Sequence, residues 1–209
     1  MPDGAPPDAQ TGAPPTDAKA QAILAQARAA FVEKGFNGAS MQDLARAAGM
    51  SAGNFYRYFP SKAAIVEALI ARDLAEVEEQ FQLVVAAPDP LAALKAALRE
   101  RLAEKCESDD TLWAEIAATA MRRPEVALIH DRIEETVARR VAQVIAVAGG
   151  VPVADAERRF GVHARMVYLV MHGAMSSHLG RAPHDDALHD LIIRTVEQVI
   201  DDALLRAKD

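Results

Sequence analysis

Apolar residues recur every three or four positions through most of the chain, which is the spacing of one face of an α-helix. Between residues 62 and 85 they stand at positions 70, 74, 77, 81 and 84, which predicts a helix packed along its whole length. Similar patterns, bounded by Gly, Pro and Asp, predict eight further helices at 19–34, 41–48, 52–58, 91–106, 110–121, 124–148, 154–179 and 185–205. No strand-like alternation stands out, so we expect an all-α fold with about nine helices.

The helices divide into two groups of unequal size. Residues 1–18 hold five of the eleven prolines, and we expect this segment to be a disordered tail. Three short helices within residues 19–62 predict a small N-terminal domain. The long helix that follows joins this domain to a larger helical body, residues 63–209.

The segment from residue 40 to residue 62 reads SMQDLARAAGMSAGNFYRYFPSK and predicts two short helices joined by a tight turn. Gly49 supplies a left-handed end to the first helix, and Ser51 caps the start of the second. Ser40 and Asp43 have the spacing of a capping box. This pattern is a helix–turn–helix, whose second helix lies in the major groove of DNA.

A helix that reads DNA needs an apolar inner face, small first residues and flanking hydrogen-bond donors. Phe55 and Phe59, four positions apart, supply the inner face. Lys62 begins the next helix, where its charge and the free backbone amides can hold a phosphate together. The small residues and the donors are Ala52, Gly53, Asn54, Tyr56, Arg57 and Tyr58.

The formal charge of −7 argues against a wholly basic nucleic-acid binder, but the charge is unevenly spread. Residues 19–62 contain six Lys and Arg against two Asp and Glu, a balance of +4 that leaves −11 for the rest. The single cysteine, Cys106, allows no intramolecular disulfide, and charged residues interrupt every apolar run. With no secretory signal pattern, these features predict a cytoplasmic protein that does not enter a membrane.

The run AGNFYRYFPSKAAI, preceded by SMQDLARAAGMS, resembles the DNA-binding domain of the TetR family of transcriptional regulators. The resemblance covers roughly residues 20–69, and beyond them only the number and lengths of the helices are similar. It implies a homodimer that binds double-stranded DNA at a palindromic operator, usually as a repressor. A small-molecule effector bound in the C-terminal body would move the fourth helix and release the operator. By position, the resemblance implies DNA contacts from Ser40, Gln42, Ala52, Gly53, Asn54, Tyr56, Arg57, Tyr58 and Lys62.

The last helix is apolar on more than one face, so it is expected to have two partners, and small residues near the end of the helix before it permit close helix approach. The resemblance implies that these two helices form a four-helix bundle with a second subunit, and a wholly intramolecular bundle is the alternative. A pocket for the effector would lie among the fourth, fifth, sixth, seventh and eighth helices. The candidate lining residues are Phe81, Trp113, Ile116, Met121, His130, Met166, Tyr168, Met171 and His172. This mixture of Met and aromatic side chains suits a hydrophobic or aromatic effector, and it equally suits a core.

An enzyme is the main rival class. The sequence has no nucleophile motif, no phosphate-binding glycine loop and no paired Glu-x-x-His units for a metal. We therefore expect no catalytic residues, no metal and no cofactor. A DNA-bound protein that recruits a protein partner without a small ligand remains an alternative, because the apolar pattern does not reveal a pocket.

Overall fold

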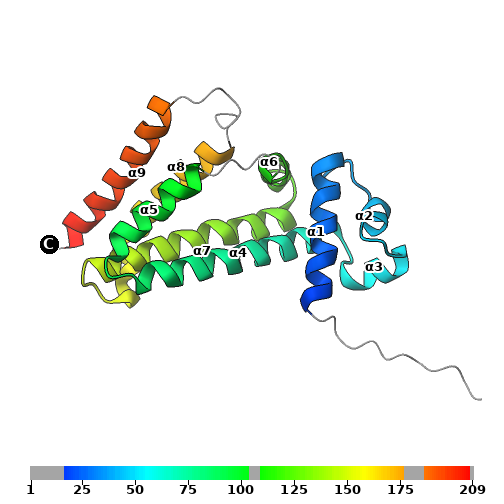
Figure 1. The fold of residues 1–209 in the computed structure, drawn as a ribbon, viewed down its shortest axis with the longest axis horizontal. Coiled ribbons are helices and arrows are strands. Elements are labelled where there is room, and N and C mark those ends of the chain that lie inside the picture. The colour runs from blue at the N-terminus through cyan, green and yellow to red at the C-terminus, as the bar shows by residue number, and fades with distance from the viewer. Residues whose placement is uncertain (1–16, 104–108, 177–185, 208–209) are drawn as a thin grey trace, which may run out of the picture.

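The structure is a computed structural model that describes residues 17–103, 109–176 and 186–207 (Figure 1). Within these ranges it contains nine α-helices, one short 3-10 helix and no strand. The helices are α1 (Asp17–Lys34), α2 (Met41–Ala47), α3 (Ala52–Tyr58), α4 (Lys62–Ala86), α5 (Pro90–Ala103), α6 (Asp109–Ala120), α7 (Pro124–Ala148), α8 (Ala156–Ser176) and α9 (Asp186–Ala207). The predicted all-α fold is confirmed.

Most predicted helix ends lie within two residues of the observed ones, and two regions differ. Residues 17 and 18, expected in the tail, belong to α1, and the rest of that tail lies outside the described residues. A 3-10 turn, Val153–Asp155, precedes α8, which therefore starts two residues later than expected. The predicted ends of the fifth and eighth helices, including Cys106, also fall outside the described ranges.

The long helices α4 and α7 run side by side through the molecule (Figure 1). At one end stand α1, α2 and α3. Toward the other end α5, α8 and α9 pack against α7, and α5 also contacts α4. Helix α7 contacts α4, α5, α6, α8 and α9, so it is the central helix of the body. None of the helices in the described ranges has the length and apolarity needed to cross a lipid bilayer.

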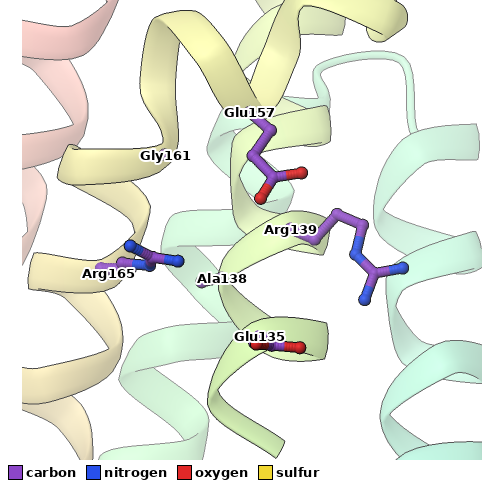
Figure 2. A pocket seen from close by; sticks show the side chains of 6 residues that line it. All are labelled: Glu135, Ala138, Arg139, Glu157, Gly161 and Arg165. Carbon is purple, nitrogen blue, oxygen red and sulfur yellow. The ribbon is translucent and has the colours of Figure 1, made fainter. Parts of the chain in front are cut away.

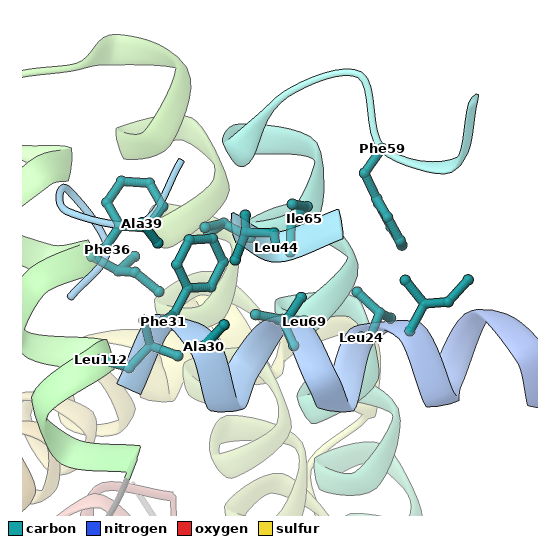
Figure 3. Packing of buried hydrophobic residues seen from close by; sticks show 14 of the residues in the cluster. Leu24, Ala30, Phe31, Phe36, Ala39, Leu44, Phe59, Ile65, Leu69 and Leu112 are labelled. Carbon is teal, nitrogen blue, oxygen red and sulfur yellow. The ribbon is translucent and has the colours of Figure 1, made fainter. Parts of the chain in front are cut away.

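Buried apolar side chains form two clusters, and the first extends beyond the three N-terminal helices. It joins α1, α2 and α3 to the start of α4, and it also includes residues of α6 and of the first turns of α7. Figure 3 shows Phe31, Phe36 and Leu112 meeting in this cluster. The predicted domain boundary at residue 62 stays a prediction, but the buried core does not end there.

The second cluster lies between the far end of α4 and helices α5, α7, α8 and α9. The fourth helix therefore passes from one cluster to the other. Ile70 and Val84 are buried, whereas Leu74, Val77 and Phe81 are only half-buried. Leu74 nevertheless packs against the first cluster and Phe81 against the second, so α4 is packed over most of its length and is only less buried between the two cores.

Candidate DNA-binding site

The turn between α2 and α3 has the geometry that its sequence predicts. Gly49 adopts a left-handed conformation with φ of +65°. Its N–H donates to the carbonyl oxygen of Arg46 at 3.0 Å, and the N–H of Met50 donates to that of Ala45 at 2.9 Å. This pair of bonds closes a helix at a left-handed glycine. Ser51 then caps α3 by accepting the N–H of Asn54 at 3.4 Å.

Helix α3 is fixed to the core by one face and exposed on the other. Phe55 is fully buried, Phe59 is nearly so, and their ring centroids lie 5.8 Å apart. Both residues were predicted to form the inner face, and that prediction is confirmed. Among the predicted DNA contacts of α3, Gly53, Asn54, Tyr56 and Arg57 are exposed, whereas Ala52 and Tyr58 are half-buried.

A capping box starts α2, as expected. The N–H of Asp43 donates to Ser40 Oγ at 3.1 Å, and the N–H of Ser40 donates to Asp43 Oδ2 at 3.0 Å. The Ser40 hydroxyl also donates to the same carboxylate, so it is already engaged within α2. Gln42, the other predicted contact of this helix, is exposed.

Lys34 links the capping box to α1. Its Nζ donates to Asp43 Oδ1 at 2.6 Å, which ties the last turn of one helix to the first turn of the next. Together with the bonds from Ser40, this contact holds the pKa of Asp43 well below its usual value, and Lys34 is the largest cause. Helices α1 and α2 are thus joined by a local polar contact as well as by their core.

The side chain of Lys62 lies along the turn between α1 and α2. Its Nζ donates to the carbonyl oxygens of Phe36 at 2.8 Å and Asn37 at 3.2 Å, and it stands 5.3 Å from the centre of the Phe36 ring. Burial, and then the charge of Arg123, lower the pKa of Lys62. An ammonium group has three donors, so one N–H is left for the predicted phosphate contact.

Sequence reasoning missed Glu115 of α6. Its Oε2 accepts the N–H of Phe36, which is 79 positions away in the chain. Gly35, beside it, has φ of +76°, and a Cβ at this position would lie 3.0 Å from Glu115 Oε1. The glycine could have been noticed as the end of α1, but no local pattern indicates its partner on α6.

Comparison with known proteins agrees with this geometry. The sequence pattern of the bacterial regulatory proteins of the tetR family matches residues 23–69. The HTH-type transcriptional regulator UidR of Escherichia coli (strain K12) is 32% identical over 140 residues, which are 63% of this chain and 67% of that protein. This chain belongs to the TetR family of transcriptional regulators. The predictions of a helix–turn–helix DNA-binding regulator, and of a regulator rather than an enzyme, are thereby confirmed.

Two solved structures of TetR-like proteins show the same fold over nearly the whole chain. The structure of Salmonella enterica GusR has a TM-score of 0.72 and 26% identity, and the match covers 90% of this chain and 97% of GusR. A TetR transcription regulator from Haloarcula marismortui has a TM-score of 0.70 and 19% identity, with 90% of this chain and 98% of that one covered. The arrangement of an N-terminal helix–turn–helix and a larger helical body is therefore confirmed.

In this TetR regulator, three of the predicted pocket residues form a cluster of rings between α7 and α8. Tyr168 and His172 stack with centroids 5.4 Å apart and planes 10° apart. The ring of His130 meets His172 edge-on at 5.8 Å. Burial, followed by the charges of Glu134 and Asp131, raises the pKa of Tyr168 to about 12.

The pKa of His172 is shifted in the direction that keeps its ring neutral. Burial lowers it, His130 lowers it further, and Glu134 opposes the change. At neutral pH, the uncharged imidazole is therefore the favoured form of His172 in the folded protein. No group of three or more His, Cys, Asp and Glu side chains in the described part of the chain is arranged to hold a metal ion.

The remaining pocket candidates lie in other surroundings. Met121 is 88% exposed because it follows the end of α6, and Met166 is 45% exposed because it lies on the outer side of α8. The expectation that these two line an interior pocket is corrected, since apolar spacing alone does not show which side of a helix is covered. Ile116 belongs to the first core cluster and Met171 to the second, and Phe81 is half-buried against the latter. The side chain of Trp113 is outside the described residues.

Two surface hollows adjoin α8, and neither is lined by the ring cluster. A cleft of about 190 Å³ lies between α7 and α8 (Figure 2). Its lining is mostly charged and consists of Glu135, Ala138, Arg139, Glu157, Gly161 and Arg165. A more apolar groove of about 380 Å³ lies between α8 and α9. Its lining residues are Val162, His163, Met166, Thr195, Gln198, Val199 and Asp202.

Proposed function

We propose that this TetR regulator is a homodimeric repressor that reads a palindromic operator through α3 and leaves it when a small molecule binds the body. The observation that carries the proposal is the outer side of α3. There, Asn54, Tyr56 and Arg57 are exposed while Phe55, between them, is fully buried. A helix anchored in this way presents side chains to base edges at a fixed angle. Such a repressor would act in the cytoplasm, beside the DNA.

The body supports dimerisation through α8 and α9. Val162 is 81% exposed, and Met166, Leu169 and Leu191 are also exposed on these two helices. An apolar surface of this kind on a regulator's outer helices fits a second copy of the chain, related by a two-fold axis. Two copies of α3 would then stand about 34–36 Å apart, one turn of B-DNA.

The ring cluster between α7 and α8 is the best-supported effector site. Tyr168 and His172 offer flat, mostly buried faces, and their polar atoms can orient a ligand. A hydrophobic or aromatic effector would enter by taking the place of one ring contact, for example the edge of His130 against His172. Because α7 also packs against α4, a change at this cluster has a direct route to the helix that carries Lys62.

The test is to select bound fragments from the source genome, and then to screen compounds for release of the selected fragment. We expect one fragment class with two inverted half-sites, bound by a dimer at micromolar protein. A compound that releases wild-type protein should lose its effect on a variant with His172→Ala. Only monomer at micromolar concentration, or fragments without inverted half-sites, would contradict the proposal.

A second candidate is a DNA-bound regulator that recruits a protein and has no small-molecule effector. It is favoured by the position of the two hollows, both of which lie at the surface of α8 rather than at the ring cluster of His130, Tyr168 and His172. If no compound changes operator affinity, and a protein co-purifies with the wild-type regulator but not with Arg165→Glu, this second function replaces effector release.

A further inference from the structure

The backbone of Phe36 is held from two sides, by a side chain at the start of α4 and by one of α6. Its N–H donates to the carboxylate of Glu115 on α6, and its carbonyl oxygen accepts from Nζ of Lys62 at the start of α4. Phe36 stands in the turn between α1 and α2, so neither partner belongs to the helices that this turn connects. The position of this turn therefore depends on the positions of both α4 and α6.

The contact with α6 is close and is supported by packing. Leu112 and Ile116, on the same side of α6 as Glu115, are buried in the first core cluster together with Phe31 and Phe36. The two phenylalanine rings lie 5.3 Å apart. The left-handed Gly35 leaves the space that the carboxylate occupies, because a Cβ there would lie within 3.1 Å of both carboxylate oxygens.

The turn passes directly into the DNA-reading helices. Ser40, four residues after Phe36, begins the capping box of α2, and Lys34 on the other side of the turn is bonded to Asp43. Helices α2 and α3 follow as one packed unit. A displacement of α6 relative to α1 would thus pull on the N–H of Phe36 and tilt this unit.

We propose that Glu115 is a positioning residue for operator binding, which ties the helix–turn–helix to α6 and lets the position of α6 set the orientation of α3. The inference rests on the proposed DNA-binding function of α3. It adds a connection through α6 to the covalent one through α4. Glu115 itself does not contact DNA in this proposal, and it acts through the peptide of Phe36.

Electrostatics alone predicts the opposite change in DNA affinity from the one that loss of a positioning contact would cause. Removing a carboxylate near a basic DNA-binding domain, with no other effect, strengthens binding to the phosphate backbone. Loss of a positioning contact does the opposite, because the free protein then samples orientations of α3 that cannot bind. The direction of the change in affinity therefore separates a positioning role from a simple change in charge.

The experiment compares wild-type protein with Glu115→Ala, Glu115→Met and Glu115→Gln on an operator fragment selected by the wild type. Glu79→Ala is the matched control, because Glu79 is an exposed carboxylate on α4 that is remote from the turn. Affinity is measured by fluorescence anisotropy at several salt concentrations. We expect Ala and Met at position 115 to weaken binding on the order of tenfold, which is the loss of one charge-assisted hydrogen bond. The salt slope should stay unchanged, because no phosphate contact is lost.

Glutamine keeps an oxygen acceptor and should restore most of the affinity, and Glu79→Ala should bind as well as wild type or slightly tighter. Hydrogen exchange at the Phe36 amide should accelerate in the Ala and Met variants only. Methionine preserves the volume of the side chain, so it stands in for alanine if alanine impairs folding. Wild-type affinity or tighter binding in a folded Met variant with a fast-exchanging Phe36 amide would overturn the inference. Failure of the wild type to bind any fragment would overturn the proposed function itself, and the inference with it.

Discussion

Lys34 and Asp43 join α1 to α2 by a hydrogen bond of 2.6 Å between the lysine Nζ and the carboxylate. The same carboxylate accepts the N–H of Ser40 and so closes the capping box. These contacts stabilise the charged form of Asp43 and lower its pKa in the folded protein. The junction between the two helices therefore keeps its charged carboxylate to a lower pH than an ordinary aspartate would.

The first prediction is a pH-dependent contribution of Asp43 to stability. Because its folded pKa is lowered, the contribution is fully present above the unfolded pKa of 3.8, begins to fall below that pH and is lost completely only when the pH falls below the folded pKa. Asp43→Asn should lower the unfolding temperature at pH 7, and the difference from wild type should shrink toward pH 3. Asp190→Asn, at an exposed site on α9, is the control. A difference of equal size at pH 7 and pH 3 would contradict the assignment.

Two left-handed glycines give the second prediction. Gly35 and Gly49 have φ of +76° and +65°, but only Gly35 has a neighbour, the Glu115 carboxylate, within 4 Å of an added Cβ. Gly49→Ala should cost about 1–2 kcal/mol of unfolding free energy, from the backbone conformation alone. Gly35→Ala should cost more, because the new methyl group also displaces Glu115.

Urea denaturation of both single variants, and of Gly35→Ala combined with Glu115→Ala, measures this excess. In the double variant the methyl group no longer meets a carboxylate, so its cost should approach that of Gly49→Ala. Equal losses of unfolding free energy in the two single glycine variants would show that the close approach of the new Cβ to Glu115 does not destabilise the fold.

The local features of the DNA-binding unit could be predicted from sequence, because each depends on residues a few positions apart. The serine caps, the left-handed Gly49 and the inward Phe55 are of this kind, and all three are confirmed. The contact between Phe36 and Glu115 could not be predicted, because 79 residues separate the partners and only the packing of α6 brings them together.

The sequence also did not predict which surroundings the long side chains have in the fold. Lys62 is predicted to contact a phosphate, and the sequence did not show that its Nζ also donates to carbonyl oxygens of the turn. Met121 and Met166 were expected inside the body, but methionine suits an exposed surface as well as a core. Periodicity shows that a helix has an apolar side, whereas the neighbouring helices decide which positions are covered.

The third prediction concerns Tyr56, which is 46% exposed on α3. Tyr56→Ala should weaken binding to the selected operator about tenfold or more and reduce discrimination against altered half-sites. Tyr56→Phe keeps the ring and loses the hydroxyl, so it separates stacking from hydrogen bonding. Anisotropy titrations on the operator and on single-base variants measure both effects. If Tyr56→Ala discriminates against altered half-sites as well as the wild type does, Tyr56 does not take part in recognising the base sequence.

The fourth prediction tests the apolar side of α8. Val162→Glu places a charge at the most exposed apolar position of the groove between α8 and α9, and it should convert the dimer to monomer at micromolar concentration. Leu83→Glu changes an exposed leucine on α4 in the same way and should leave the dimer intact. Sedimentation velocity measures both. A Val162→Glu protein that stays dimeric would show that the dimer interface lies elsewhere, with α8 and α9 bundled only within their own subunit.

The fifth prediction follows from the ring cluster. The folded pKa of His172 lies below its usual value of 6.5, so the unfolded chain takes up a proton first as the pH falls. This residue should therefore reduce stability as the pH drops below about 6.5. His172→Phe keeps a ring against Tyr168 and should flatten the change in unfolding temperature between pH 7 and pH 5. A parallel pH profile for wild type and variant would contradict the shift.

The first core cluster also limits how such a regulator can be re-engineered. Leu112 of α6 is buried beside Phe31 and Phe36 of the DNA-binding unit, which lies far from it in sequence (Figure 3). Ile116 of α6 belongs to the same cluster. In a chimera that exchanges only residues 1–62, these α6 side chains would pack against residues from the other protein. Grafting a new specificity onto this body should therefore transplant the matching surface of α6 together with the reading helices, or else retain α1 and its turn and exchange α3 alone.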